Sequence, residues 1–303
     1  MINKTNSKLL LSVGIASIVV ALVLIILKAF TEFKTGSVSV LAGLMDSVAD
    51  LLSSVINLIG ISIGLKPADK NHNYGHAKAE GLSSFIQATF ILGSAMLIIF
   101  SAVGRLLHPY PIEHTQVAIM VMIITILVTG ILSLFQHYAI KRTNSLSLAA
   151  DTSHYISDLL LNSSIILSLL LVQLGYFSMD AILAIIIGLW MIYLSGKIMR
   201  GAFTILMDET LSESEVIKIE QAISLTPGVN GFHDLMTRSD GKTHYIHVHI
   251  EVDENLTFRA SHDIATNVVV NLNRLFDKPI KAFIHTDPSL TEEVSYYKSL
   301  EVY

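Results

Sequence analysis

The chain of 303 residues contains no cysteine. This absence excludes a disulfide framework, a thiolate nucleophile and any metal site built on cysteine. Charged residues are also few: they make up 15% of the chain, whereas 52% of the residues are hydrophobic, and the mean hydropathy is +0.60. Such a balance excludes an ordinary soluble domain and indicates a protein that crosses a membrane several times.

Six apolar segments follow one another, each close to the length of about 20 residues that is needed to span a bilayer. Turn-forming stretches such as FKTGS, HPYPIEH and KRTNS separate them. The first segment is long enough to span and lacks a clear small-residue cleavage site, so we interpret it as a transmembrane helix and not as a signal peptide. The predicted helices of this transmembrane domain (residues 1–207) cover 9–31, 39–64, 81–106, 115–139, 147–172 and 178–200.

Lysine and arginine are concentrated in the loops on one side of the predicted membrane. By the positive-inside rule this side is cytoplasmic, so we expect both termini in the cytoplasm and a multi-pass protein of the cell inner (plasma) membrane. The opposite side has only Lys34 and Arg105 near its loops. The residues on the cytoplasmic side are Lys4, Lys8, Lys66, Lys70, Lys78, Lys141, Arg142, Lys197 and Arg200.

Residues 208–303 have a different composition and predict a soluble cytoplasmic domain. The stretch SESEVIKIEQAIS begins with a Ser–x–x–Glu capping signal and continues with helical periodicity. Two strands follow around an Asp240–Gly241 turn, which is a strong hairpin signal. A second amphipathic helix over 257–276 and a last strand in KPIKAFIHTDP complete the order α-β-β-α-β. This order predicts a small α+β, metallochaperone-like domain with its helices on one face of the sheet.

Asp46 and Asp50 lie four residues apart in the second apolar segment. They share one face of a helix, where they repel each other, and each costs about 2.5–3.5 kcal/mol at the bilayer centre. His154 and Asp158 repeat this spacing in the fifth segment. One such residue is readily explained as a hydrogen-bonding group between helices; two pairs on separate spans favour a metal cage. Three carboxylates and one imidazole suit a tetrahedral borderline divalent ion, zinc first.

Asp151 lies one turn before His154, and we expect it near the start of the fifth helix. A carboxylate at a helix N-terminus caps the backbone and favours the helix dipole. Capping therefore accounts for Asp151, and we leave it out of the predicted metal site.

The six spans, the two acidic motifs and the C-terminal α-β-β-α-β domain resemble the cation diffusion facilitator family, in particular its bacterial zinc exporters of the YiiP type. The resemblance implies that Asp46, Asp50, His154 and Asp158 form the transport site and exchange metal for protons within a homodimer. It also favours the zinc and cadmium type, because manganese transporters of the family tend to lack the histidine.

Asp69, His72 and His76 lie in the loop between the second and third spans, with spacings of three and four residues. On spacing alone they form either a zinc site with one open position or a solvated loop with unrelated histidines. The resembling exporters have a loop site with this Asp–x2–His–x3–His pattern, which favours zinc binding.

The resemblance further implies a binuclear metal site in the cytoplasmic domain. Histidines that merely titrate at the surface are the alternative. His244 and His247 have no counterpart in that site, so we expect them at the surface or behind the ligands. Lys78 and Asp208 match a family salt bridge that locks the dimer. The implied ligands are His233, His249, His262, His285 and Asp287.

The predicted function is export of Zn²⁺ from the cytoplasm by a divalent cation/proton antiporter, with Cd²⁺, Fe²⁺ and Co²⁺ left open as cargo. The expected partners are the metal ion, protons, the lipid bilayer and a second copy of the chain, without nucleic acid or nucleotide, since the chain has no G-x-x-x-x-G-K-[ST] loop. An intramembrane metalloenzyme is disfavoured because there is no H-E-x-x-H motif and four ligands would close the site. The alternative is a membrane-tethered zinc sensor whose cytoplasmic domain dimerises on metal.

Overall fold

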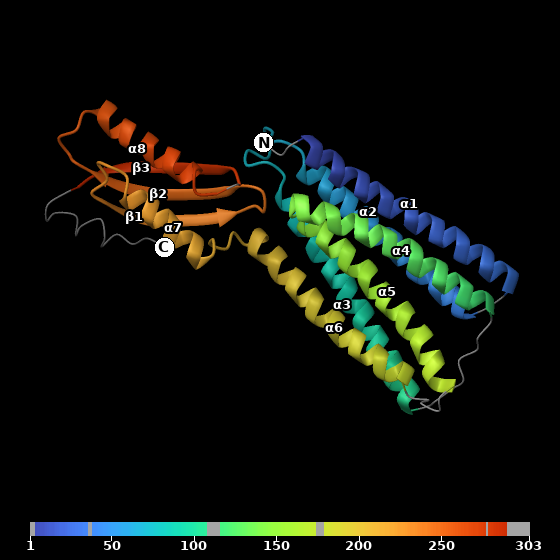
Figure 1. The fold of residues 1–303 in the computed structure, drawn as a ribbon. Helices are drawn as coiled ribbons and strands as arrows, with labels where there is room; N and C mark the ends of the chain where they lie inside the picture. The colour runs from blue at the N-terminus through green and yellow to red at the C-terminus, as the bar shows by residue number, and fades with distance from the viewer. Residues whose placement is uncertain (1–3, 36–37, 108–115, 174–178, 277, 290–303) are drawn as a thin grey trace. The chain divides into compact units, whose positions relative to one another are not determined.

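Six long helices form the first part of the protein, which we describe from a computed structural model (Figure 1). The structure describes all residues except 1–3, 36–37, 108–115, 174–178, 277 and 290–303, and for some positions within the helices it describes the backbone alone. The helices are α1 (Lys4–Thr35), α2 (Val38–Gly64), α3 (Lys78–Leu107), α4 (Gln116–Thr143), α5 (Leu146–Gln173) and α6 (Met179–Leu206).

Each of these helices is long enough to span a membrane. In a bilayer every backbone polar group must be satisfied within the protein, and a helix achieves this within one segment. Among the described residues, four stretches are long and apolar enough to cross a membrane: Asn6–Phe30, Lys78–Gly104, Met122–Thr143 and Ala181–Leu206. In α2 the apolar stretch within the described part is the shorter Asp50–Gly64.

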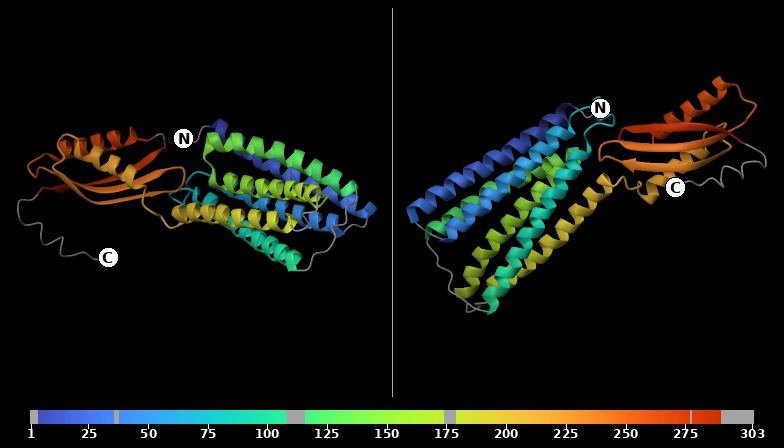
Figure 2. Two further views of the ribbon diagram at one scale, coloured as in Figure 1. Left: turned by 60° about the horizontal axis from the view of Figure 1, so that its bottom comes forward. Right: turned by 180° about the vertical axis from the view of Figure 1, so that it is seen from behind.

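The helical unit consists of residues 2–203, and its helices are drawn as ribbons in Figures 1 and 2. Many of the side chains buried in this unit are polar, whereas large apolar side chains lie on its surface. Helix α1 packs along α2 and α4, and α5 packs against α2, α3 and α4. Asn57, Gln87 and Gln136 are fully buried, while Phe100 and Leu134 are more than 70% exposed. This inverted distribution suits a bundle whose outer surface faces lipid and whose centre holds a polar site.

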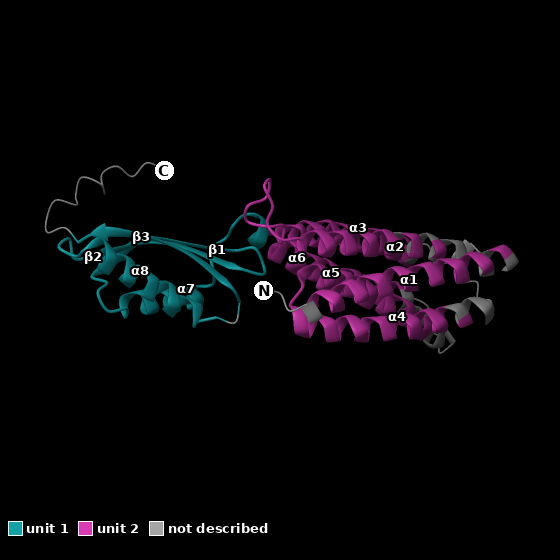
Figure 3. Cartoon of the chain, turned by 90° about the horizontal axis from the view of Figure 1, so that it is seen from above, with its two compact units in different colours: residues 1, 204–303 teal, residues 2–203 magenta. Residues whose placement is uncertain are grey.

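The second compact unit, residues 204–303, contains three strands and two helices (Figure 3). Strand β2 is central, antiparallel to β1 and parallel to β3. Helices α7 and α8 cover one face of the sheet, where Ile219 and Leu272 pack on Ile246 and Ile250. The elements are α7 (Glu213–Ser224), β1 (Gly231–Ser239), β2 (His244–Val252), α8 (Phe258–Asn273) and β3 (Ile280–Pro288).

Local sequence signals account for the ends of these elements. The Glu215 carboxylate accepts hydrogen bonds from the backbone N–H and the hydroxyl of Ser212, which fixes the start of α7. Between β1 and β2, Asp240 Oδ1 accepts the backbone N–H groups of Lys242 and Thr243. Gly241 lies in this turn with φ = +91°, a conformation that L side chains rarely adopt. The helical membrane region followed by an α-β-β-α-β domain agrees with the predicted fold class.

Candidate functional site

The first cluster of potential metal ligands lies inside the helical bundle. His154 Nε2 on α5 is 2.8 Å from Asp50 Oδ1 on α2 and 3.9 Å from Asp158 Oδ2 on its own helix. All three residues are buried, with 3–6% of their surface exposed, and one ligand atom from each lies within 4.8 Å of the others. The structure therefore brings together three of the four residues predicted for this site.

The fourth predicted ligand, Asp46, lies on the backbone of α2, but its side chain is outside the described residues. On α5, His154 and Asp158 lie four residues apart, so they share one face of the helix. Packing of α2 against α5 then brings Asp50 to these two residues, which is how residues distant in sequence form one cluster.

The intramembrane cluster has the donor set of a site for a borderline divalent cation. Carboxylate oxygens and one imidazole nitrogen are typical ligands of zinc and of neighbouring transition metals, whereas magnesium and calcium prefer oxygen alone. Two carboxylates and one histidine buried together are expensive in a bilayer unless a cation or protons neutralise them. The chemistry of Asp50, His154 and Asp158 therefore suits reversible binding of such a cation.

Asp151 does not cap α5, contrary to our expectation. The helix begins at Leu146, and Ser145 provides the hydroxyl that accepts a backbone N–H at its start. Asp151 is fully buried one turn further on. Its two carboxylate oxygens accept hydrogen bonds from Ser54 (3.3 Å) and Gln136 (2.8 Å). The capping interpretation fails because Asp151 is the sixth residue of α5, beyond the first turn whose backbone N–H groups lack partners within the helix.

The second cluster forms in the loop between α2 and α3. Asp69 Oδ1 is 3.3 Å from His72 Nδ1, and Asp69 Oδ2 is 3.3 Å from His76 Nε2. The two imidazole rings are 4.5 Å apart. Backbone N–H groups of His72 and Asn71 donate to Asp69 and lower the pKa of its carboxyl group. The structure thus brings all three predicted loop residues into ligand range of one another.

His76 is oriented by a hydrogen bond outside the loop cluster. Its Nδ1 lies 3.1 Å from the carbonyl oxygen of Pro67, which can only accept a hydrogen bond. Nδ1 therefore carries the hydrogen, and Nε2 keeps the lone pair that a metal requires. A second interaction of this kind is typical of ligating histidines, and it favours metal binding over a casual grouping of side chains.

The third cluster lies on the face of the sheet opposite α7 and α8. The strand register places His233 of β1 beside His249 of β2, and His249 beside His285 of β3. Asp287 connects them: its Oδ2 is 2.9 Å from His249 Nδ1 and 3.3 Å from His233 Nε2, and its Oδ1 is 3.1 Å from His285 Nε2. A carboxylate that uses both oxygens in this way can bridge two metal ions.

One residue of this region was not predicted from the sequence. Asp234 Oδ2 is 3.1 Å from His233 Nδ1, and the two residues group with His249 as a further set of potential ligands. Asp234 has φ = +50° at the irregularity in the β1–β2 ladder between His233 and Met236. The bulge turns the side chain toward the histidines, and no strand periodicity could have indicated this.

His262 lies apart from the clusters that the described residues form. It is an exposed residue of α8, the helix that covers the other face of the sheet. Its assignment as a ligand stays a prediction. The same holds for the salt bridge between Lys78 and Asp208, which belong to different compact units. Within its own unit, Asp208 Oδ1 is 3.0 Å from Arg238 Nη1.

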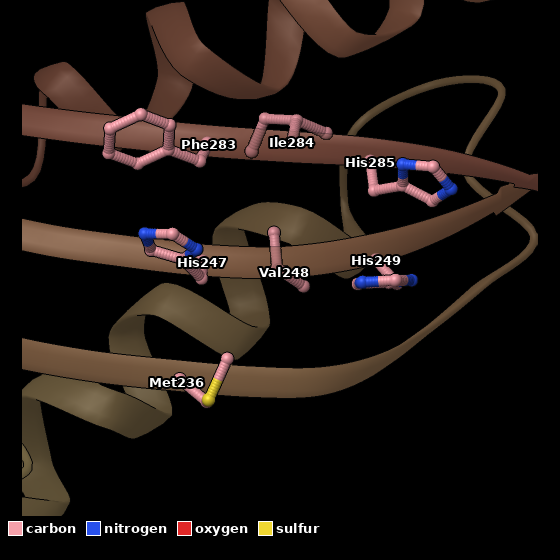
Figure 4. A pocket seen from close by; sticks show the side chains of 7 residues that line it. All are labelled: Met236, His247, Val248, His249, Phe283, Ile284 and His285. Atoms are coloured by element: carbon pink, nitrogen blue, oxygen red, sulfur yellow. The ribbon is translucent and has the colours of Figure 1, made fainter.

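The two remaining histidines of β2 differ in environment. His244 is buried, with 4% of its surface exposed, and its ring is 5.3 Å from that of Phe276. Our expectation of a surface position was therefore wrong for this residue, since alternate residues of β2 face the helices. His247 faces the other way and stacks on Phe283 at 4.5 Å. It borders a hollow of about 360 Å³ (Figure 4), lined by Met236, His247, Val248, His249, Phe283, Ile284 and His285.

Comparison with known proteins gives matches over nearly the whole chain. The profile of a family described as the cation efflux transmembrane domain matches residues 14–207, and that of the cation efflux protein, cytoplasmic domain, matches 211–289. The cation-efflux pump FieF of Citrobacter koseri is 36% identical over 286 residues, which are 94% of this chain and 95% of the relative. The FieF pump of Escherichia fergusonii has the same identity and coverage.

Among solved structures, a match is found to the metal-bound C-terminal domain of the CzcD transporter from Thermotoga maritima. It is 22% identical and aligns with 27% of this chain and 100% of that domain, with a TM-score of 0.25.

Proposed function

The chain belongs to the cation diffusion facilitator family, and from this membership we propose that it exports Zn²⁺ from the cytoplasm in exchange for protons. Members of the family are transport proteins and not enzymes, and this chain is accordingly a multi-pass membrane protein that exports metal cations. The identity of the metal and the coupling to protons are the parts that we propose.

The observation that carries this proposal is the buried contact between Asp50, His154 and Asp158. Carboxylates and imidazole that converge inside a membrane bundle are explained by a divalent cation that they bind and release. The mixed oxygen and nitrogen donor set favours zinc over magnesium or calcium. Cadmium, iron and cobalt accept related donors, so direct competition between ions is needed to rank them.

Proton exchange follows from the chemistry of the same atoms. A carboxylate and an imidazole must be deprotonated to bind a metal, so proton binding weakens metal binding. His154 Nε2 faces both carboxylates, and the position that a proton occupies on this nitrogen is the position that the metal needs. Protonation on the outer side would expel zinc, and the protonated site would then return protons to the cytoplasm.

We further propose that the chain forms a homodimer with both termini in the cytoplasm. His233, His249, His285 and Asp287 would hold two metal ions, with His262 of α8 as a further ligand predicted from the family, and Asp69, His72 and His76 would hold another ion. The proposed ligands of the soluble unit other than His262 lie on a sheet face that neither α7 nor α8 covers, where a second copy of the chain can approach. Lys78 and Asp208 would stabilise this dimer by their salt bridge.

Reconstitution tests the proposal directly. The purified protein is placed in proteoliposomes that enclose a zinc-sensitive dye, and zinc uptake is followed under an imposed pH gradient. We expect Asp50→Ala to reduce gradient-driven flux at least about tenfold, because it removes a ligand. Asp263→Ala, the same change at an exposed position of α8, is the matched control and should behave like the wild type.

Equal flux in the wild type and in Asp50→Ala would overturn the proposed transport site. Flux that ignores the pH gradient would overturn proton exchange and leave export itself standing. If the wild type binds zinc in the cytoplasmic domain but moves none, the alternative of a membrane-tethered zinc sensor is favoured instead, since that function needs only the clusters of the soluble unit.

A further inference from the structure

A row of buried polar side chains runs between α2, α3 and α5, and Ser147 is at its centre. The Ser147 hydroxyl donates to Asn57 Oδ1 (2.6 Å), accepts from Gln87 Nε2 (3.3 Å) and lies 2.8 Å from Ser83 Oγ. None of these four residues is more than 4% exposed. Three helices therefore meet at a contact made of hydroxyl and amide groups, with no charged side chain among them.

At one end this row reaches Glu80, because the Ser83 hydroxyl that contacts Ser147 also contacts the Glu80 backbone carbonyl oxygen, to which it lies within 3.0 Å. Ser145, two residues before Ser147, donates its hydroxyl to Glu80 Oε2 at 3.3 Å. Glu80 is 7% exposed and lies in the first turn of α3, where the chain arrives from the loop that carries Asp69. This end of the row therefore lies at the end of the bundle from which that loop emerges.

At the other end lies Asp151, which the metal site does not use. Ser54 and Gln136 donate to its two oxygens, and Ser54 also lies 2.9 Å from the Tyr155 hydroxyl. Gln136 in turn reaches Ser17 of α1 at 2.9 Å. The groups that face Asp151 from α1, α2 and α4 are thus neutral.

The row ends beside the metal cluster. Ser54 follows Asp50 by one turn of α2, and Asp151 precedes His154 by one turn of α5. Asn57, one turn beyond Ser54, continues the row toward Ser147. On α5 itself, the titratable neighbours of Asp151 are Tyr155 and His154.

Three amide atoms along the row lack a hydrogen-bond partner among the residues that the structure describes. They are Asn57 Nδ2, Gln87 Oε1 and Gln136 Oε1. Buried amide groups are normally satisfied by protein or by ordered water, and an unsatisfied one is costly. Polar pockets of this kind hold water molecules that make two to four hydrogen bonds each. Such waters would close the gaps between Asp151, Asn57 and Gln87.

Hydroxyl and amide contacts between helices also serve as simple packing contacts in membranes. Packing alone does not explain a fully buried carboxylate at one end and a second buried carboxylate at the other. An ionisable residue within a membrane bundle is costly, and its usual role lies on an ion or proton pathway.

We propose that this row of polar side chains, the polar ladder, conducts protons from the protonated metal cluster to the cytoplasm, on a route separate from that of the metal. The route leads from Asp151 through waters held by the Asn57 and Gln87 amides and through the Ser147 hydroxyl to Glu80; the amides hold the waters and do not themselves carry the proton. The proposal rests on the proton exchange put forward above. Asp151 accepts a proton and passes it on, and each hydroxyl or water that takes up one proton releases another. Glu80 transfers the proton to the solution, so the ladder returns to its starting state.

The test separates proton movement from metal movement. Ser147→Ala breaks the centre of the ladder, Ser147→Thr restores a hydroxyl, and Asp151→Asn removes the titratable group at its end. Ser195→Ala is the matched control, because Ser195 is equally buried but donates to the backbone of Ala88 outside the ladder. For each variant we measure zinc affinity, pH-driven zinc flux, and exchange of isotopic zinc across the vesicle without a pH gradient, which requires no net proton transfer.

We expect Ser147→Ala and Asp151→Asn to keep zinc affinity and isotope exchange within about twofold of the wild type and to lose at least about tenfold in pH-driven flux. Ser147→Thr should recover that flux. If Ser147→Ala keeps the pH-driven zinc flux of the wild type, the proposed ladder is wrong. It is also wrong if Ser147→Ala loses isotope exchange as strongly as it loses pH-driven flux, because such a result would show that Ser147 has a structural role. If the wild type exchanges isotopic zinc but its zinc flux does not respond to a pH gradient, the proposed coupling to protons is wrong. The proposed ladder is then wrong as well, because it rests on that coupling.

Discussion

At the scale of single residues, the three clusters are built from the same two kinds of side chain. Each combines imidazole with carboxylate, and in each a carboxylate oxygen lies within 3.3 Å of an imidazole nitrogen. Both groups of such a pair must be deprotonated to bind a metal, so protons and a metal ion compete for the same atoms. The clusters differ in exposure: that of Asp50 is buried, whereas that of Asp69 lies in a polar loop. The buried cluster is therefore suited to bind and release an ion only when the bundle opens, whereas the loop cluster is suited to bind ions directly from solution.

His244 provides a prediction about pH that is independent of the metal ligands. Burial, and to a smaller extent the charge of Lys278, lowers the pKa of His244, against the opposing influence of Glu215 and Asp240. The unfolded chain therefore takes up this proton more readily than the folded domain. The stabilisation is complete above the ordinary histidine pKa of about 6.5. It is lost as the pH falls further.

Hydrogen exchange of the β2 amides measures this effect in the full-length protein with metal removed by EDTA. Protection in the wild type should decrease between pH 7.5 and pH 5.5 by more than in His244→Gln, which cannot take up the proton. An identical pH dependence in both proteins would contradict the assignment of this titration to His244. Comparing the two at each pH removes the intrinsic pH dependence of exchange.

The sequence allowed most of the residues that cluster in the structure to be anticipated, and the exceptions have physical causes. The i, i+4 spacing within one helix predicts shared faces, so Asp50, His154 and Asp158 could be chosen together. Asp151 was misjudged because it lies beyond the first turn of α5, where hydrogen bonds to Ser54 and Gln136, and not a helix end, satisfy its carboxylate. Asp234 was missed because a strand irregularity sets its direction, and periodicity carries no information about such irregularities.

At the scale of secondary structure elements, the helices extend beyond the apolar segments that reveal them. The first was expected over 9–31 and runs over Lys4–Thr35, because a polar helix end is soluble outside the hydrocarbon and continues to form its backbone hydrogen bonds. The cytoplasmic elements follow their turn and cap signals more closely. The parallel pairing of β3 with β2 depends on contacts distant in sequence, which local signals do not encode.

The cap of α7 provides a prediction at this scale. Ser212→Ala removes the hydroxyl that contacts Glu215 Oε2 at 2.6 Å. We expect the free energy of opening of α7, measured by hydrogen exchange, to fall by about 1 kcal/mol, as is usual for the loss of an N-cap. Lys218→Ala, an exposed change within the same helix, is the control. A loss of equal size in the control would show that the cap contributes nothing specific.

At the scale of the whole molecule, the chain divides into two compact units, and each contains clusters of histidine and carboxylate side chains that could bind a metal ion. The helical unit contains the cluster that we assign to transport, and the soluble unit contains the cluster that we assign to dimerisation. An exporter therefore requires the helical unit for its function, whereas a sensor requires the soluble unit.

Removal of residues 208–303 distinguishes these two functions. If the protein is an exporter, the truncated chain in proteoliposomes should retain reduced but measurable gradient-driven zinc flux, because Asp50, His154 and Asp158 are intact. Adding Asp50→Ala to the truncated chain should abolish that remainder. A truncated chain that inserts normally, binds zinc in the bundle and shows no flux would contradict this division of roles.

The strand order of the soluble unit has a consequence for synthesis of the protein. A ribosome releases β1 and β2 before α8 and β3, so the nascent hairpin presents His233 and His249 while Asp287 is still to be translated. Early capture of an ion by the hairpin would use fewer ligands and would lack the carboxylate that joins the two parts of the cluster. Firm metal loading therefore waits until the last strand has docked beside β2.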